Sequence, residues 1–475
     1  MRIKNLKTFN IYMFILLISP LSCLIILYDS KPNGYNNLWV LPLIFLVLSL
    51  ITVNVLKNLA DNITLSVIYF GYFIRFVITP LFLSLGNYTT VFNTLVDLNI
   101  QYAIIFMVYE IIIVFLCIEF YLIINKNVKK YKNKRIEINS KNYKNINLMF
   151  IILTLFCISI YLYIPEIGKY YTSFFSNNTD ALKLDYDFDN IASRGSIDRI
   201  LNTLFVFIFN IFRYIIPVYL LQLIYLKLRP SRFKFILSII ICLSPFLIVS
   251  ESNIQPFFGL LFNILMMLKL YPSKSRKIIA TIGILGVVGL VGMVIEKILS
   301  FGNWQGTSGV ASIALTLNAY FPGVGNVAAA YNVDVTNKLI TFVSDLVRTI
   351  PFNGTLFPGV STEINTTSMY NTSNYVTGQI IPNISYTSYY LGVVLSPIIP
   401  VILSLYALKM HKKANLNKDF WIYFFYIFVS IRIALIPTLY NPIAFFSILF
   451  SQILPLGLFC LFINRSKFAN RNIAK

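Results

Sequence analysis

Residues 102–125 read YAIIFMVYEIIIVFLCIEFYLIIN, and residues 126–144, which follow directly, read KNVKKYKNKRIEINSKNYK. The first stretch is long and apolar enough to cross the ~30 Å hydrocarbon core of a bilayer as one α-helix. The second stretch is strongly basic, and basic residues beside a span mark its cytoplasmic end. Together the two stretches predict a transmembrane helix that ends at the cytoplasmic surface.

Apolar runs of the same kind recur along the chain of 475 residues, which is 57% hydrophobic and only 12% charged. This composition excludes an ordinary soluble globular protein. It predicts an all-α fold, that of a polytopic integral membrane protein with about twelve transmembrane helices, and residues 1–475 are interpreted as a single transmembrane domain. The predicted spans are residues 9–28, 37–56, 63–85, 102–125, 148–165, 200–226, 235–250, 256–271, 278–298, 386–408, 419–439 and 443–463.

The positive-inside rule gives these spans a direction. With both termini in the cytoplasm, most of the 39 Lys and Arg residues lie on the cytoplasmic side, and the basic loop 126–147 is the densest group. Topology, rather than nucleic-acid binding, thus explains the net charge of +21. Two long segments, 166–199 and 300–385, then lie on the outer face, and the second is the expected active-site region. The Ile, Lys, Asn and Tyr bias is typical of an AT-rich bacterial gene, which predicts a bacterial cytoplasmic (inner) membrane.

Cysteine and histidine are not expected to contribute chemistry. All five cysteines lie within apolar runs, and His411, the only histidine, lies in a Lys-rich turn. A histidine-based triad or metal cluster on the outer face is therefore not expected. The aspartates between positions 180 and 189 lack the glycine and the final glutamate of a calcium loop. No metal and no cofactor is predicted.

Charged side chains inside spans should face an opposite charge or a watery cavity, because their burial in hydrocarbon is costly. Arg75 and Arg213 lie near the middle of their predicted spans. Each either pairs with a buried glutamate, Glu110 or Glu119, or contacts substrate from a watery cavity. Arg432 lies in the outer half of its span, where a cavity that opens outward could reach it.

The outer segment 300–385 has a helical pattern of its own. Residues 337–351, NKLITFVSDLVRTIP, place leucine, isoleucine and valine on one side of a helix and Lys338, Asp345 and Arg348 on the other. This pattern predicts a short helix that lies in the membrane interface. The motif FPGVGN, 321–326, lacks the lysine and the strand–helix setting of a phosphate-binding loop, so a tight turn between two short helices is predicted there.

Three segments in order resemble a known family. DLVRTIPF at 345–352 is followed by PGVSTEIN at 358–365 and by TGQIIPNISYTSYYLGVVLSP at 377–397, which leads into the tenth span. This order is similar to that in the large outer loop of the oligosaccharide repeat-unit polymerases, the O-antigen or capsular polysaccharide polymerases of the Wzy type. The plan of spans with a late outer loop is similar over most of the chain. One departure is SESNIQPFFG at 250–259, where many relatives have a Ser-x-Arg-Gly pattern.

The resemblance implies a GT-C-like arrangement of helices and a metal-independent glycosyltransferase. Such an enzyme moves the growing glycan from its undecaprenyl-pyrophosphate carrier onto the next lipid-linked repeat unit, on the outer face of the membrane. The implied partners are undecaprenyl-pyrophosphate-linked oligosaccharides, membrane lipids, a chain-length regulator and a flippase, with no nucleic acid.

Arginine suits this chemistry because its fixed charge and fork of donors stabilise a departing pyrophosphate without a metal. Each assignment has an alternative. Arg348 could be a surface cation that reaches lipid headgroups, and Glu251 could be a turn residue rather than a general base. The tyrosines could form an aromatic belt at the membrane interface. The candidate catalytic residues are Arg348, Arg432, Arg194 and Glu251, and the candidate substrate-binding residues are Arg213, Arg75, Arg199, Lys338, Asp345, Tyr386 and Tyr389.

Two rival functions remain open. A flippase for the same lipid-linked sugars would be expected to have short outer loops and two similar halves, and the sequence has neither. A glycan ligase shares the late-loop plan, but the histidine usual in its outer loop has no counterpart in this chain.

Overall fold

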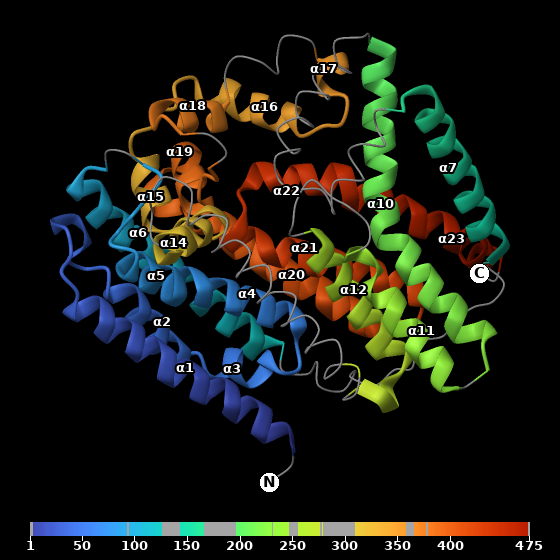
Figure 1. Cartoon of the computed structure of the whole chain (residues 1–475), viewed down its shortest axis with the longest axis horizontal. Coiled ribbons are helices and arrows are strands. Elements are labelled where there is room, and N and C mark those ends of the chain that lie inside the picture. The colour runs from blue at the N-terminus through green and yellow to red at the C-terminus, as the bar shows by residue number, and fades with distance from the viewer. Residues whose placement is uncertain are drawn as a thin grey trace. The chain divides into compact units, whose positions relative to one another are not determined.

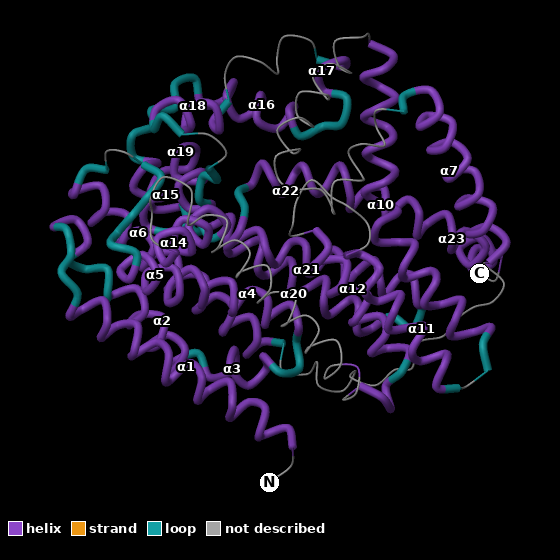
Figure 2. Tube along the Cα trace, viewed as in Figure 1, coloured by secondary structure: helices purple, strands orange, loops and turns teal. Residues whose placement is uncertain are grey.

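The computed structural model of the chain describes residues 3–92, 95–125, 143–165, 196–229, 231–246, 255–275, 278, 309–357, 365–376 and 379–473. Within these residues every regular element is a helix, which confirms the all-α prediction, and Figure 2 shows the same. The chain forms two compact units. Unit 1 comprises Met1–Lys132, Gly292–Leu416 and Tyr426–Ile448, and unit 2 comprises Asn133–Val291, Asn417–Phe425 and Leu449–Lys475.

Unit 1 is a bundle of apolar helices that carries several short helices at one end. In Figure 1 the short helices α16, α17 and α18 lie at the opposite end of this unit from the start of α1. Its elements are α1 (Ile3–Tyr28), η1 (Asn33–Tyr35), α2 (Val40–Ile51), α3 (Val53–Leu59), α4 (Ile63–Phe73), η2 (Ile74–Ile78), α5 (Thr79–Leu85), α6 (Asp97–Ile124), α14 (Gly309–Tyr320), α15 (Val324–Ala330), α16 (Lys338–Arg348), α17 (Asn353–Leu356), α18 (Thr366–Ser373), α19 (Asn383–Leu395), α20 (Ile398–Leu416), most of α21 (Phe420–Leu439) and α22 (Pro442–Ile448).

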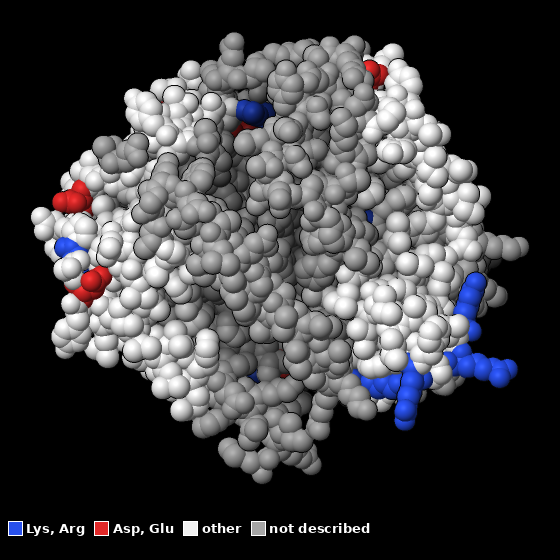
Figure 3. All heavy atoms as spheres, viewed as in Figure 1, with Lys and Arg blue, Asp and Glu red and all other residues white. Residues whose placement is uncertain are grey.

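Unit 2 is a second group of apolar helices, in which α10 packs against α7, α11 and α12. Exposed basic residues gather at the turn between α10 and α11, near the lower right edge of Figure 3, while most of the described surface on that face is uncharged. Its elements are α7 (Tyr143–Tyr163), α10 (Ser196–Lys227), α11 (Arg232–Leu243), η6 (Ser244–Phe246), α12 (Gln255–Leu270), η7 (Pro272–Lys274), η8 (Leu449–Ile453) and α23 (Leu454–Ile473).

Six described helices are long and apolar enough to cross a membrane, or seven if the bent pair α19–α20 forms one span. These helices are suited to a multi-pass membrane protein, and the number twelve stays a prediction. Most of the predicted span 278–298, of the outer loop 166–199 and of the basic loop 126–147 lies outside the described residues. The six helices are Asn33–Ile51, Ile63–Leu85, Asp97–Ile124, Ile200–Lys227, Phe420–Leu439 and Pro442–Ile463, and shorter apolar helices cover Met13–Tyr28, Asn147–Tyr163, Phe258–Leu270 and Gly309–Tyr320.

The predicted span 386–408 is not one straight helix. Helices α19 and α20 meet at an angle of 105°. Gly392 has a φ of +77°, a backbone conformation that favours glycine, so the chain leaves helical geometry inside α19. Pro397, two residues after the end of α19, has no N–H with which to continue the helical hydrogen bonds. The bend leaves α19 as a separate short helix that packs against α16.

A buried ion pair ties the short helices of unit 1 to its spans. Arg75, on η2, donates from Nη1 to both carboxylate oxygens of Glu110 on α6, each at 2.9 Å. Its Nε donates to the carbonyl oxygen of Pro322 at 2.7 Å. The Arg75 and Glu110 side chains are 1% and 0% exposed. Of the two interpretations left open for Arg75, the buried pair is the one observed.

The turn that holds Pro322 confirms the prediction for residues 321–326, because it connects α14 to α15. Gly323 lies so close to Asn318 that an added Cβ would come within 2.6 Å of the Asn318 side-chain oxygen. Glu119, the other carboxylate considered for the arginines, instead accepts hydrogen bonds from the backbone N–H groups of Asn54 and Val55 at the start of α3. A carboxylate at a helix N-terminus is stabilising, so Glu119 has a structural role.

We expect Glu110→Ala to destabilise the protein by about 3–5 kcal/mol, because it leaves the Arg75 charge buried without its carboxylate. The measurement is thermal unfolding of the purified protein in detergent, with Asp334→Ala, at an exposed position, as the control. Adding Arg75→Met to Glu110→Ala should recover part of the loss, since the uncompensated charge is gone. Equal unfolding temperatures for Glu110→Ala and the control would contradict this role for the pair.

Candidate functional site

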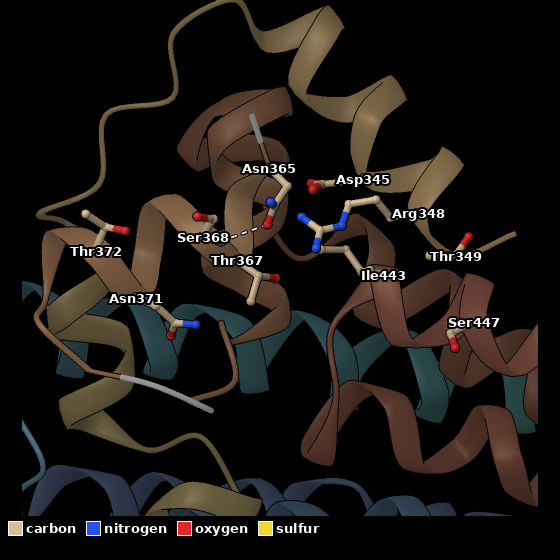
Figure 4. Close-up of a pocket in the computed structure, with 10 residues that line it drawn as sticks. All are labelled: Asp345, Arg348, Thr349, Asn365, Thr367, Ser368, Asn371, Thr372, Ile443 and Ser447. Carbon is tan, nitrogen blue, oxygen red and sulfur yellow. Dashed lines mark hydrogen bonds between the residues drawn. The ribbon is translucent and has the colours of Figure 1, made fainter. Parts of the chain in front are cut away.

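A pocket of about 510 Å³ lies among α16, α18 and α22, all in unit 1 (Figure 4). Most of its lining consists of hydroxyl and amide side chains. It contains two residues selected from the sequence, Asp345 and Arg348, and it is the candidate functional site. Its lining residues are Asp345, Arg348, Thr349, Asn365, Thr367, Ser368, Asn371, Thr372, Ile443 and Ser447.

Arg348 supplies the positive charge of the pocket. It is the last residue of α16, its side chain is exposed, and its guanidinium extends toward Thr367 and Asn365 (Figure 4). Among the described residues, this guanidinium makes no hydrogen bond or ion pair. Its donors are therefore available to an anionic ligand, which arginine can bind in a bidentate manner.

Asp345, one turn before Arg348, is only 1% exposed and already has several donors. Its Oδ1 accepts from the backbone N–H of Thr366 at 3.1 Å, and its Oδ2 accepts from the Thr366 hydroxyl at 2.5 Å and the Tyr386 hydroxyl at 3.0 Å. The hydroxyl of Tyr390 lies 3.2 Å from the same oxygen. These bonds fix α16 to α18 and α19, so Asp345 positions Arg348 rather than offering a free carboxylate to substrate.

The tyrosines behind the pocket use their hydroxyls within the protein. Tyr370, on α18, donates to the carbonyl oxygen of Asn326 at 3.2 Å, and Tyr389 donates to that of Ala330 at 2.8 Å. Burial raises the pKa of Tyr370 well above its usual range, so its hydroxyl stays protonated and remains a donor. Tyr386 supports the pocket through Asp345, and Tyr389 holds α19 to α15 without lining the pocket.

Helix α16 has the predicted two-sided pattern, with its polar side turned inward. Leu339, Ile340 and Val343 are 76%, 59% and 45% exposed, whereas Thr341 and Asp345 are buried. Exposure of such side chains to water costs roughly 1.5–3 kcal/mol each relative to burial. An apolar face of this kind is suited to contact with lipid, as predicted for a helix in the membrane interface. The pocket would lie beside the lipid surface if this prediction holds.

The other candidate residues lie elsewhere. Lys338 is exposed at the first position of α16, about 15 Å along the helix axis from Arg348. Arg432, on α21, is buried, and Arg213 is buried in α10 of unit 2. None of these three lines the pocket. Arg194 and Glu251 lie outside the described residues, and the side chain of Arg199 is likewise not described.

Sequence reasoning missed the wall of the pocket that α18 forms. Thr367, Ser368, Asn371 and Thr372 recur at helical spacing and lie on one side of this helix. The run NTTSMYNTS, 365–373, held the available signal: an Asn that can cap a helix, followed by polar residues at that spacing. The Asn365 side chain accepts from the backbone N–H of Ser368 at 2.7 Å, which begins the helix as this signal indicates.

We expect Asp345→Asn to destabilise the contact between α16 and α18, because an amide nitrogen cannot accept the hydroxyl hydrogen bonds that Oδ2 receives. Bonds to a charged group contribute about 1.5–3 kcal/mol each, so amide hydrogen exchange in α18 should rise at least tenfold. Tyr390→Phe, which removes only one of the hydroxyls around Oδ2, should have a smaller effect. Unchanged exchange in Asp345→Asn would contradict the positioning role.

Contact of α16 with lipid can be measured directly. After replacement of the five native cysteines, nitroxide labels at positions 339, 340 and 343 should collide more often with dissolved oxygen than with a water-soluble nickel chelate in reconstituted vesicles. A label at the exposed position 334 should show the reverse order. Preferential access of the nickel chelate to all three α16 positions would show that this face contacts water.

Comparisons of the chain with protein-family models, with curated proteins and with solved structures find no match. Two features of the chain therefore support a function. One is the resemblance of residues 345–397 to the repeat-unit polymerases, and the other is the chemistry of the pocket that these same residues largely form.

Proposed function

We propose that this protein is a repeat-unit polymerase of a bacterial cytoplasmic membrane. It would join undecaprenyl-pyrophosphate-linked oligosaccharides into a surface polysaccharide, O-antigen or capsule, as a metal-independent glycosyltransferase. The observation that carries the proposal is the position of Arg348, uncommitted among the described residues, at the end of a helix with an exposed apolar face and beside a wall of hydroxyl and amide groups. Twelve spans, a GT-C-like arrangement and cytoplasmic termini belong to the same proposal.

The pocket offers what a lipid-linked sugar needs. Such a substrate has its pyrophosphate at the headgroup level, its lipid in the bilayer and its sugars outside. During transfer, the oxygen of the acceptor hydroxyl forms a bond to the anomeric carbon and its proton passes to the departing pyrophosphate, which leaves with the electrons of the broken bond. Arg348 would stabilise the charge on that pyrophosphate, as a fixed donor does best where charge develops.

The size of the surface glycan tests this function. Deletion of the gene should leave a single repeat unit where the wild-type strain carries long polymer, and a plasmid copy should restore the polymer. Accumulation of unexported lipid-linked repeats inside the cell would instead support a flippase. Polymer that forms at full length but is not attached to its final acceptor would support a ligase.

We expect Arg348→Ala to abolish long polymer while the protein is expressed normally, because the departing pyrophosphate loses its bidentate cation. Arg348→Lys should restore it only in part, because lysine is a point charge without the planar fork. Arg229→Ala, which removes an exposed arginine outside the pocket, is the matched control. Full-length polymer from Arg348→Ala would remove Arg348 from the proposed mechanism.

A further inference from the structure

Helix α18 has two polar faces that differ in their hydrogen bonding. On the face toward the protein, Thr366 binds Asp345, Tyr370 binds the backbone of α15, and Asn374, just after the helix, donates to the carbonyl of Tyr370 at 2.9 Å. Each of these side chains is buried. This face therefore holds the helix in place.

The face toward the pocket is different. Its four polar side chains, Thr367, Ser368, Asn371 and Thr372, make no side-chain hydrogen bond with any described residue. The Oδ1 atom of Asn371 is buried and has no hydrogen-bond partner among the residues described. A buried amide oxygen without a hydrogen bond does not contribute to the stability of the fold. Since no described residue holds this oxygen and Asn371 lines the pocket, the amide can rotate to hydrogen-bond with a ligand.

The chemistry of this face specifies the kind of ligand. It carries hydroxyl and amide groups but no charge, and side chains three or four positions apart on a helix are about 5–6 Å apart. Such groups can reach opposite edges of one pyranose ring. A pocket of about 510 Å³ is also within the usual range for small-ligand sites.

We propose that the pocket face of α18 binds the neutral sugar ring that is attached directly to the carrier pyrophosphate. This inference rests on the proposed function, because Arg348, whose guanidinium points toward Thr367, would hold that pyrophosphate (Figure 4). The side-chain amide of Asn371 hydrogen-bonds to a hydroxyl or acetamido group of the ring. The hydroxyls of Thr367 and Ser368 complete the contact.

The test is polymerisation in vesicles, with lipid-linked repeat units extracted from the deletion strain as substrate. Asn371→Ala should raise KM about tenfold, the effect of losing one hydrogen bond that leaves a ligand group unpaired. Thr367→Val should raise KM less. Ser373→Ala, on the same helix but outside the pocket, should leave KM unchanged.

Thermal unfolding separates ligand binding from support of the fold. Asn371→Ala should not lower the unfolding temperature, because the lost oxygen has no partner within the described structure, whereas Asn374→Ala should lower it. Wild-type activity with an unchanged KM in both Asn371→Ala and Thr367→Val would overturn the α18 site alone. Absence of polymer with the wild-type protein would overturn the proposed function and this site together.

Discussion

A charge buried among membrane helices must find its partner within the protein, because hydrocarbon offers neither water nor counter-ions. Arg75 and Glu110 meet this requirement, and the third interaction, from Arg75 to the carbonyl of Pro322, has the larger consequence. It attaches the turn between α14 and α15, far along the chain, to two apolar helices near its beginning. This buried charge thus helps to fix the short helices that form the pocket to the spans.

From this turn a series of polar contacts leads to the pocket. The backbone of α15 accepts hydrogen bonds from Tyr370 on α18 and from Tyr389 on α19. Helix α19 also carries Tyr386, which donates to Asp345. Asp345 is one helical turn from Arg348 on α16. The hydrogen bonds that hold Asp345 therefore also position Arg348. The cation of the pocket is positioned by contacts that it does not itself make, and its donors stay available.

The sequence allowed local features to be predicted and left long-range ones open. The helix at 337–351 and the turn at 321–326 follow from periodicity and turn chemistry, which depend on neighbours in the chain. That Asp345 and Arg348 share one pocket follows from the same helical spacing. The partner of Arg75 stayed open because two glutamates on α6 were equally plausible, and only tertiary packing places Glu119 at the start of α3. The bend at Gly392 was missed because hydrophobicity alone does not report backbone conformation.

The polar groups of the pocket are of two kinds: some make hydrogen bonds within the fold, and others make none among the described residues. Both carboxylate oxygens of Asp345 accept hydrogen bonds, as a buried carboxylate requires. The protein would lose stability if a substrate displaced these donors. Arg348 and the amide oxygen of Asn371 are uncommitted among the described residues. Both residues line the pocket, so their polar groups are available to a ligand bound there. Because α16 turns its apolar face outward beside these groups, the pocket suits the proposed substrate, in which a lipid, an anion and a sugar follow one another.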